Sequence, residues 1–324
     1  MISYAHSMHL GNHEDVDRVV VEAFGQSEAG NIATQNDDSF LLADMERSVL
    51  VTESNVPDAD APQFIDMHSQ LFLVADGVGG PSGGRASRLA AACMLRQVAA
   101  RFPTALRRRR LCETDVEQQM RQALQQSQQE LRDVASKVPQ LSRMSTTLTA
   151  AHLIWPTLCV AHIGDSRCYL LRGGKLQQLT TDYAESLQRL SIDKTRLSQL
   201  RRQASDHQGE RAAAGTSSDL LSASPEVVTM RLRPDDAVIL CTSGLSNHVS
   251  DEKICDAVLA ARTPEEACQW LVQSAKNAGG LDNVTVVVVR VPAAGLPNGL
   301  SHLVELAPLP CLQTRSDALE GGLQ

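Results

Sequence analysis

The chain has 324 residues, of which 43% are hydrophobic and 21% charged, and its formal net charge at pH 7 is −8. This hydrophobic content is enough for one large domain or two small ones. The acidic balance argues against nucleic acid as a partner. No stretch reaches the roughly 18 uninterrupted apolar residues of a membrane span, and the N-terminus lacks the basic and apolar blocks of a signal peptide. We therefore expect a cytoplasmic protein that contacts no membrane.

Three sequence features have a simple structural interpretation. The eight cysteines are scattered and form no C-x-x-C pair, so we expect reduced core residues and no structural zinc. His6, His9 and His13 could bind a metal, but a flexible N-terminus over residues 1–14 is favoured. The basic run Arg107–Arg110 is typical of a solvated helix end, with docking of an acidic partner as the alternative.

The first part of the chain predicts a strand, a loop and a connection. Val19–Phe24 alternates weakly, as in an edge strand. Gly30–Leu42 combines a polar loop with an apolar run, and the loop holds Asp37 and Asp38. Adjacent loop acids are usually turn or N-cap residues, although beside a metal one of them can reach an ion. We expect residues 43–69 to be a variable connection.

The stretch Leu71–Ser87 predicts a strand, a glycine-rich turn and a helix. Its apolar run from Leu71 to Ala75 is typical of a buried strand and ends on Asp76. Five glycines follow before a helical pattern begins near Ala86. A carboxylate at a strand end, followed by glycines that let a ligand approach closely, suits a hard divalent cation or a phosphate. The same pattern also occurs as ordinary loop chemistry.

The middle of the chain changes from helical to strand periodicity. A capping box at Thr114 and Glu117 begins a second long helix. Short strands are then expected at Thr147–Trp155, Leu158–Ile163, Cys168–Leu171 and Leu176–Thr180. Their closely spaced turns indicate an antiparallel meander, and Asp165 lies in one of these turns. The polar residues 184–223 predict an insertion or flap.

The last part of the chain returns to strands and helices. We expect strands at Glu226–Leu232 and Ala237–Thr242, and then two helices that begin after Ser250 and after Thr263. A last strand is expected at Val286–Val291. Ser243 follows the second of these strands, and Asp282 with Asn283 precedes the last, which should be central. Residues 293–324 carry no fold signal and are expected to form an irregular tail.

Four acids therefore fall at predicted strand ends beside glycine or asparagine: Asp38, Asp76, Asp165 and Asp282. Carboxylates that a fold gathers together repel one another unless cations neutralise them. Because no His or Cys set favours zinc, such a cluster indicates Mg²⁺ or Mn²⁺ held by oxygen ligands. The alternative is that these acids are turn residues in an inert fold.

The ordered motifs NDDS, ADGVGG, MSTT, GDSRCYLLRGGKLQQLTTD, LCTSGLS and GGLDNVTVVVVRV resemble the metal-dependent protein phosphatases (PPM, protein phosphatase 2C-like) over roughly residues 15–292. The resemblance implies an α+β fold, a four-layer α/β/β/α sandwich with two antiparallel sheets between helices. It also implies a two-metal centre that activates a water to hydrolyse phosphoserine or phosphothreonine. We therefore expect a signalling enzyme, monomeric, that acts on phosphorylated protein substrates made by a cognate kinase.

Residue roles follow from the resemblance, position by position. Asp76 would bridge two Mn²⁺ or Mg²⁺ ions, and the Gly77 carbonyl would bind one of them. Asp282 would bind the other ion, Asp38 would act directly or through a water, and Asp165 would hold an additional weaker ion. The implied catalytic residues are Asp38, Asp76 and Asp282. The implied supporting residues are Asp37, Asn283 and Ser243.

The chain departs from the family pattern at several of these positions. Ala33 stands where the family has a phosphate-binding arginine, and Ser243 stands where it has a metal-binding aspartate. Asp37 replaces a longer glutamate, and Val78 offers no imidazole. A serine hydroxyl is a poor ligand, so one metal site should be weakened, unless another residue, such as Asp182 or an acid in the flap, replaces the missing carboxylate. The alternative function is a catalytically impaired regulatory or phosphoprotein-binding protein, and the substrate-binding residues stay unknown.

Overall fold

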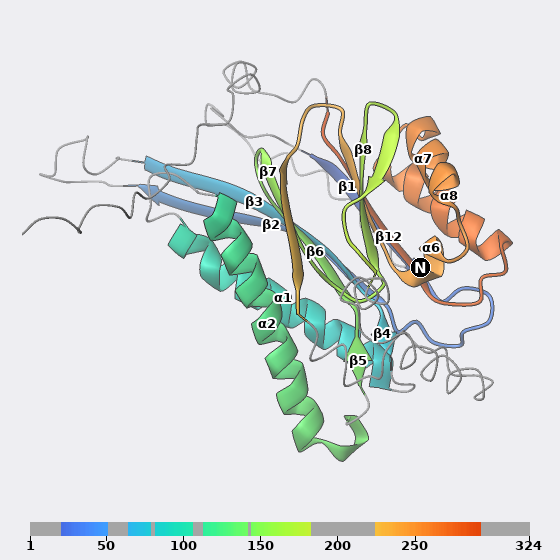
Figure 1. The fold of residues 1–324 in the computed structure, drawn as a ribbon, viewed down its shortest axis with the longest axis horizontal. Coiled ribbons are helices and arrows are strands. Elements are labelled where there is room, and N and C mark those ends of the chain that lie inside the picture. Colours follow the sequence, from blue (N-terminus) through green and yellow to red (C-terminus); the bar gives the residue numbers. More distant parts are fainter. Residues whose placement is uncertain are drawn as a thin grey trace, which may run out of the picture.

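The computed structural model describes residues 21–50, 64–78, 82–105, 113–141, 144–182 and 224–292. Within these ranges, two five-stranded sheets lie face to face, and a pair of helices packs on the outside of each sheet (Figure 1). The expectations for residues 1–14, 184–223 and 293–324, and for the basic run at 107–110, fall outside the described residues.

The first sheet has the strand order β10-β7-β6-β3-β2, and all its neighbours are antiparallel. Its strands are β2 (Ser39–Leu50), β3 (Phe64–Ala75), β6 (Leu148–Ile154), β7 (Thr157–Ile163) and β10 (Glu226–Arg231). Helices α1 (Gly83–Ala105) and α2 (Glu113–Lys137) pack on its outer face, and a short 3-10 helix, Pro139–Leu141, follows α2.

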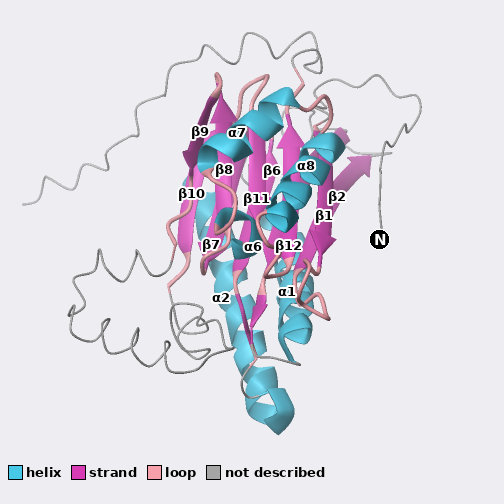
Figure 2. Ribbon diagram, turned by 90° about the vertical axis from the view of Figure 1, so that its right-hand side faces the viewer, coloured by secondary structure: helices cyan, strands magenta, loops and turns pink. Residues whose placement is uncertain are grey.

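The second sheet has the order β1-β12-β11-β8-β9 and is also antiparallel. Its strands are β1 (Glu22–Glu28), β8 (Arg167–Arg172), β9 (Lys175–Gln178), β11 (Ala237–Cys241) and β12 (Val284–Arg290). Helices α7 (Asp251–Ala260) and α8 (Pro264–Asn277) cover its outer face (Figure 2). The short helix α6 (Ser243–Ser246) follows β11, and a two-residue ribbon pairs β4 (Gly77–Val78) with β5 (Ser145–Thr146).

Three apolar layers hold the sandwich together. In β3, Leu71 and Leu73 pack towards α1 and α2, whereas Phe72 and Val74 pack towards the second sheet. Strand β12 alternates in the same way between α8 and the first sheet. Because these strands are buried on both faces, they are continuous apolar runs in the sequence. The predicted four-layer α/β/β/α sandwich is confirmed.

The prediction of a variable connection over residues 43–69 is wrong. Strand β2 runs to Leu50 and β3 begins at Phe64, and the two pair continuously from Ser39–Ala75 to Leu50–Phe64. Strand β2 lies at the edge of its sheet. An edge strand needs no continuous apolar run, because neighbouring elements cover it only in part. The mixed composition of 43–50 and 64–69 therefore concealed a long two-stranded ribbon.

The prediction of one antiparallel meander is also wrong. Strands β6 and β7 form a hairpin in the first sheet, whereas β8 and β9 form a hairpin in the second. The chain crosses between the sheets at Gly164, whose φ is +116°. A Cβ there would lie 2.6 Å from the Thr147 side chain, so the crossing is tightly packed. This crossing, which local turn signals cannot reveal, places Asp165 at the edge of the sandwich.

The described cysteines agree with the expected reduced core. All six are free, and five of them are buried: Cys93, Cys159, Cys168, Cys241 and Cys268. None of the helices in the described part of the chain is both long and apolar enough to cross a membrane.

Candidate active site

The main chain of Asp76 is fixed from two directions where β3 ends. Its N–H donates to Thr147 Oγ1 at 3.0 Å. Its carbonyl accepts from the Thr147 N–H at 3.0 Å and from Thr146 Oγ1 at 2.8 Å. Thr147 Oγ1 also lies 2.6 Å from Ser166 Oγ, next to Asp165. The two threonines therefore act on the main chain and link the segments that carry Asp76 and Asp165.

Asp37 connects the loop before β2 to the start of α1. Its Oδ1 accepts from the Gly84 N–H at 2.9 Å, and its carbonyl accepts from Ser87 Oγ at 2.5 Å. A Cβ on Gly77 would lie 2.2 Å from the Gly83 carbonyl oxygen and 2.6 Å from that of Asp37. The glycines after Asp76 thus allow three backbone segments to meet, and Asp37 serves as the joint between them.

The Asp38 carboxylate is buried, and its two oxygens differ in their hydrogen-bond partners. Its Oδ2 accepts from Thr242 Oγ1 at 2.8 Å and from Thr285 Oγ1 at 2.7 Å. Its Oδ1 is buried without a hydrogen-bond partner. Burial raises the pKa of Asp38 to about 7, the charges of Asp282 and Asp37 add to this rise, and the two hydroxyls oppose it.

Asn283 joins the loop before β12 to the loop before β2. Its Oδ1 accepts from the Asp37 N–H at 2.8 Å, and its Nδ2 donates to the carbonyls of Ala29 and Gln35. A Cβ on Gly244 would lie 1.8 Å from the Asn283 carbonyl oxygen, so α6 packs directly on this loop. Asn283 therefore links the loop that carries Asp282 to the loop that carries Asp38.

Ser243 lies directly against Asp76. It is the first residue of α6 and is only 7% exposed. Its hydroxyl donates to Asp76 Oδ2 at 3.2 Å. The sequence identified Ser243 as a departure from a family pattern, and the structure shows that a carboxylate at this position would face Asp76.

Burial and neighbouring charges also raise the pKa of Asp76 and of Asp165. Burial holds the pKa of Asp76 well above its usual range, and the charges of Asp38, Asp165 and Asp282 raise it further. The pKa of Asp165 is also raised, first by burial and then by the charge of Asp182. Acids from four separate parts of the sequence are thus brought together at one edge of the sandwich. Such a cluster favours protonation unless a cation neutralises it.

The donor set fits a hard cation but is not a complete ligand cage. Buried carboxylate oxygens, one of them without a partner in Asp38, are suitable ligands for Mg²⁺ or Mn²⁺. Within the described ranges, however, no three His, Cys, Asp or Glu side chains are already close enough together to hold a metal. Cation binding here therefore needs main-chain carbonyls, waters or a small movement of the carboxylates.

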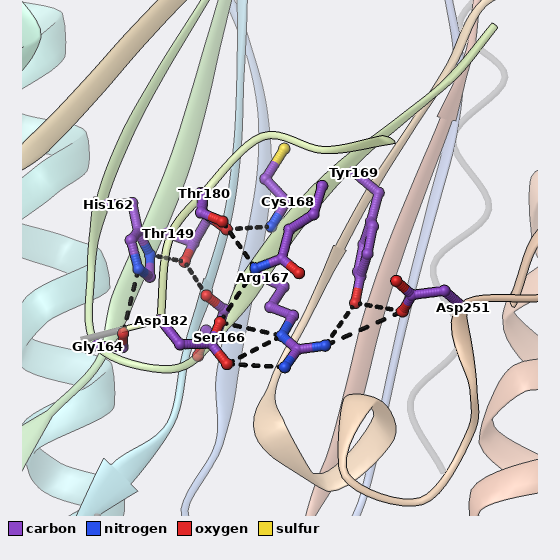
Figure 3. A network of polar contacts seen from close by, with 11 residues as sticks. Thr149, His162, Gly164, Ser166, Arg167, Cys168, Tyr169, Thr180, Asp182 and Asp251 are labelled. Atoms are coloured by element: carbon purple, nitrogen blue, oxygen red, sulfur yellow. Dashed lines mark hydrogen bonds and ion pairs between the residues drawn. The ribbon is translucent and has the colours of Figure 1, made fainter. Parts of the chain in front are cut away.

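Asp182, the candidate substitute for the missing carboxylate, is paired with Arg167 (Figure 3). Arg167 Nη2 donates to Asp182 Oδ2 at 2.7 Å, and Arg167 Nε donates to Asp182 Oδ1 at 3.0 Å. Arg167 also donates to the Tyr169 hydroxyl, which in turn donates to Asp251 at the start of α7. Asp182 thus belongs to an ion-pair network beside Asp165, and both of its carboxylate oxygens accept hydrogen bonds from Arg167.

Sequence reasoning missed the two threonines that hold Asp38. Thr242 and Thr285 are both fully buried, and Thr285 is the one hydroxyl residue in the strand sequence VTVVVVR. A single polar side chain in a buried apolar strand must find a partner. That mismatch was the available signal, although the sequence could not tell which acid Thr285 would contact.

The sandwich and the acids at its edge define a PPM-type phosphatase fold, and comparisons with known proteins agree. The family model described as "Protein phosphatase 2C" matches residues 65–284. The chain therefore belongs to the protein phosphatase 2C family, as the sequence motifs predicted.

Curated relatives carry related names. The serine/threonine protein phosphatase PstP of Mycobacterium tuberculosis (strain H37Rv) is 37% identical over 153 residues, which are 47% of this chain and 29% of that protein. The serine/threonine phosphatase stp of Listeria monocytogenes (serovar 1/2a) is 28% identical over 223 residues, which are 68% of this chain and 84% of that protein. The chain thus matches less than a third of the mycobacterial relative's length.

Solved structures show the same fold. The catalytic domain of PstP "in complex with 2 Manganese ions" is 27% identical with a TM-score of 0.58, and the match covers 85% of this chain and 100% of that one. The phosphatase MsPP from Mycobacterium smegmatis, in complex with cacodylate, is 25% identical with a TM-score of 0.56 and the same coverage.

Proposed function

We propose that this chain is a metal-dependent protein serine/threonine phosphatase that hydrolyses phosphoserine and phosphothreonine. One observation carries the proposal: acids from four distant segments, Asp38, Asp76, Asp165 and Asp282, meet at one edge of the sandwich. Burial raises the pKa of Asp76 there, and the charges of the other three acids raise it further. The names of the relatives support the same reaction class. The phosphatase domain is proposed to span residues 15–292.

The proposed cofactor is Mn²⁺ or Mg²⁺, in two sites of unequal strength. Asp76, the Gly77 carbonyl, Asp282 and Asp38 would hold the ions, and Asp165 would serve a weaker additional site. Two bound cations would acidify a water and offset the negative charge of the phosphoryl oxygens. The PstP structure with two manganese ions supports this choice of cofactor.

The residues of the chain would prepare the site before substrate arrives. Thr147 fixes the main chain of Asp76, and Asn283 ties the Asp282 loop to the loop of Asp38. Thr242 and Thr285 occupy Oδ2 of Asp38 and leave Oδ1 for a ligand. Groups held in place in this way need little reorganisation during the reaction.

Substrate recognition would depend on the cations more than on protein charge. Ala33, where the family pattern has an arginine, offers no charge to a phosphate. We therefore propose weak docking of a phosphorylated protein, itself the product of a serine/threonine kinase. Action as a cytoplasmic monomer stays a prediction from the sequence.

A second candidate is a catalytically impaired regulator that binds cations or phosphoproteins. The hydroxyl of Ser243 on Asp76 favours it, because it places a neutral group where the family pattern has a carboxylate. The ion pair of Asp182 with Arg167 argues against Asp182 as a substitute, and the acids of the predicted flap lie outside the described residues. This candidate predicts weak binding of cations or binding of a single ion, and no turnover.

The deciding experiment is hydrolysis of p-nitrophenyl phosphate and of a phosphothreonine peptide in millimolar Mn²⁺. Asp76→Asn tests the site, and Asp256→Asn, which removes an exposed acid on α7, is the matched control. Metal-dependent turnover that is lost only in Asp76→Asn would support the phosphatase. Inactivity of the wild type, with activity gained in Ser243→Asp, would support the impaired regulator. Inactivity of both would contradict the phosphatase proposal.

A further inference from the structure

Asp38 stands at the end of a chain of hydrogen bonds that begins beside β1. Asn36 Nδ2 donates to Ser27 Oγ at 2.8 Å. Ser27 Oγ lies 2.7 Å from Thr285 Oγ1. Thr285 Oγ1 donates to Asp38 Oδ2 at 2.7 Å. Three side chains from β1, β12 and the loop before β2 are thus connected in series to one carboxylate oxygen.

The chemistry of the donors fixes the direction of this chain. An amide NH₂ group can only donate, so Ser27 accepts from Asn36. An ionised carboxylate can only accept, so the single hydroxyl hydrogen of Thr285 goes to Asp38. The link between the two hydroxyls must therefore run from Ser27 to Thr285. Every donor points towards Asp38, an arrangement in which hydrogen bonds strengthen one another.

Asn36 also acts on the main chain of the same residue. Its Oδ1 accepts from the Asp38 N–H at 3.1 Å. The amide of Asn36 therefore controls Asp38 twice, directly at the backbone and through two hydroxyls at the carboxylate. Rotation of the Asn36 side chain would break both connections at once.

Both hydroxyl groups that hydrogen-bond to the Asp38 carboxylate donate to the same oxygen, Oδ2. Thr242 adds a second hydroxyl to Oδ2 at 2.8 Å, whereas Oδ1 is buried and has no partner. A carboxylate whose Oδ2 is saturated by two hydroxyls can offer a cation only its Oδ1. Partners of this kind, which orient a ligand without touching the metal, typically control metal affinity.

We propose that Asn36, Ser27 and Thr285 form a positioning relay that orients Asp38 so that Oδ1 alone binds a divalent cation. The relay depends on the proposed function only in requiring that this edge of the sandwich bind a cation. None of the three residues would touch the substrate. They are positioning residues, and Asp38 is the group through which they act.

Calorimetric titration of the full chain with Mn²⁺, above neutral pH, tests the relay. Ser27→Ala and Thr285→Val should each weaken Mn²⁺ binding by about 10- to 100-fold. Thr285→Ser should restore most of the affinity, because it keeps the hydroxyl. In the Thr285→Val background, Ser27→Ala should have little further effect, because the relay is already broken. Ser127→Ala is the matched control, since it removes a buried hydroxyl that bonds only within α2.

The outcomes separate the relay from the phosphatase activity. Full Mn²⁺ affinity in both Ser27→Ala and Thr285→Val, or independent and additive losses, would overturn the relay. A weakened Ser127→Ala control would also count against it, because any lost buried hydroxyl would then have the same effect. A wild type that binds Mn²⁺ but lacks turnover would contradict only the proposed activity. A wild type that takes up no Mn²⁺ would overturn both proposals.

Discussion

Replacing Ser243 by aspartate should destabilise the metal-free protein but should not destabilise the protein with a bound cation. The Ser243 hydroxyl lies 3.2 Å from Asp76 Oδ2, so a carboxylate here would face Asp76 at about 4 Å. At an effective dielectric constant of about 20, two such charges repel by about 4 kcal/mol. Protonating Asp76 relieves this repulsion, and because burial already holds the pKa of Asp76 well above its usual range, this costs less than the roughly 4 kcal/mol that an ordinary aspartate needs at neutral pH.

We therefore expect Ser243→Asp to lower the free energy of unfolding by about 2 to 4 kcal/mol in EDTA. Millimolar Mn²⁺ should remove this loss, because a cation between the two carboxylates converts repulsion into attraction. A tenfold gain in Mn²⁺ affinity alone adds about 1.4 kcal/mol of stability at saturating metal. The variant should thus be less stable than wild type without metal and at least as stable with it.

Urea unfolding in EDTA and in millimolar Mn²⁺ measures both effects. Ser243→Asn is the matched control, because it has the size of aspartate without the charge. Equal stability of the Asp and Asn variants in EDTA would refute the charge argument. A loss in Ser243→Asp that Mn²⁺ does not restore would refute the assignment of this edge as a cation site.

Three further predictions follow from the same geometry. Because the pKa of Asp38 is raised to about 7, the native state holds this proton more tightly than the unfolded chain. In EDTA, the stability difference between wild type and Asp38→Asn should therefore fall as pH rises towards 7 and level off above it. Gly244→Ala should cost about 3 kcal/mol or more in urea unfolding, because its Cβ would lie 1.8 Å from the Asn283 carbonyl. Asp182→Asn should leave the tightest Mn²⁺ affinity in calorimetry unchanged, because Asp182 is paired with Arg167.

Each of these predictions has a clear contrary result. A stability difference that stays constant between about pH 4 and 7, or that rises with pH below this range, would mean that the native pKa of Asp38 is not raised. A Gly244→Ala variant as stable as wild type would mean that α6 does not pack on the Asn283 loop. Loss of Mn²⁺ binding in Asp182→Asn would make this residue the substitute ligand that the structure argues against.

The buried strands were predictable because both of their faces lie in cores. The apolar run at Leu71–Ala75 and the valine run of β12 needed only local composition. The signals for the helix starts at Ser250 and Thr263 were also confined to a few neighbouring residues. Thr263 Oγ1 accepts from the Glu266 N–H, as expected of an N-cap residue. Features encoded within one segment were therefore accessible from sequence alone.

The remaining features depend on contacts between distant segments. The hairpins on either side of Gly164 look alike in sequence, and only their partners, β3 and β11, assign them to different sheets. In the same way, Ser27 and Thr285 lie 258 positions apart and meet only because β1 pairs with β12. The acids were predicted one by one, but the hydroxyls that hold Asp38 were not.

The architecture of the site explains how Ser243 can stand where a carboxylate is usual without damage to the fold. The acidic residues are positioned mainly through the main chain, by Thr147 at Asp76 and by the contact of Gly244 with Asn283. None of these contacts uses the Ser243 side chain. In the absence of metal, a hydroxyl that donates to Asp76 also avoids the repulsion that a fifth carboxylate would add. We therefore expect serine at this position to lower cation affinity and to raise the stability of the metal-free protein. The different effects expected for Ser243→Asp with and without Mn²⁺ would measure both changes.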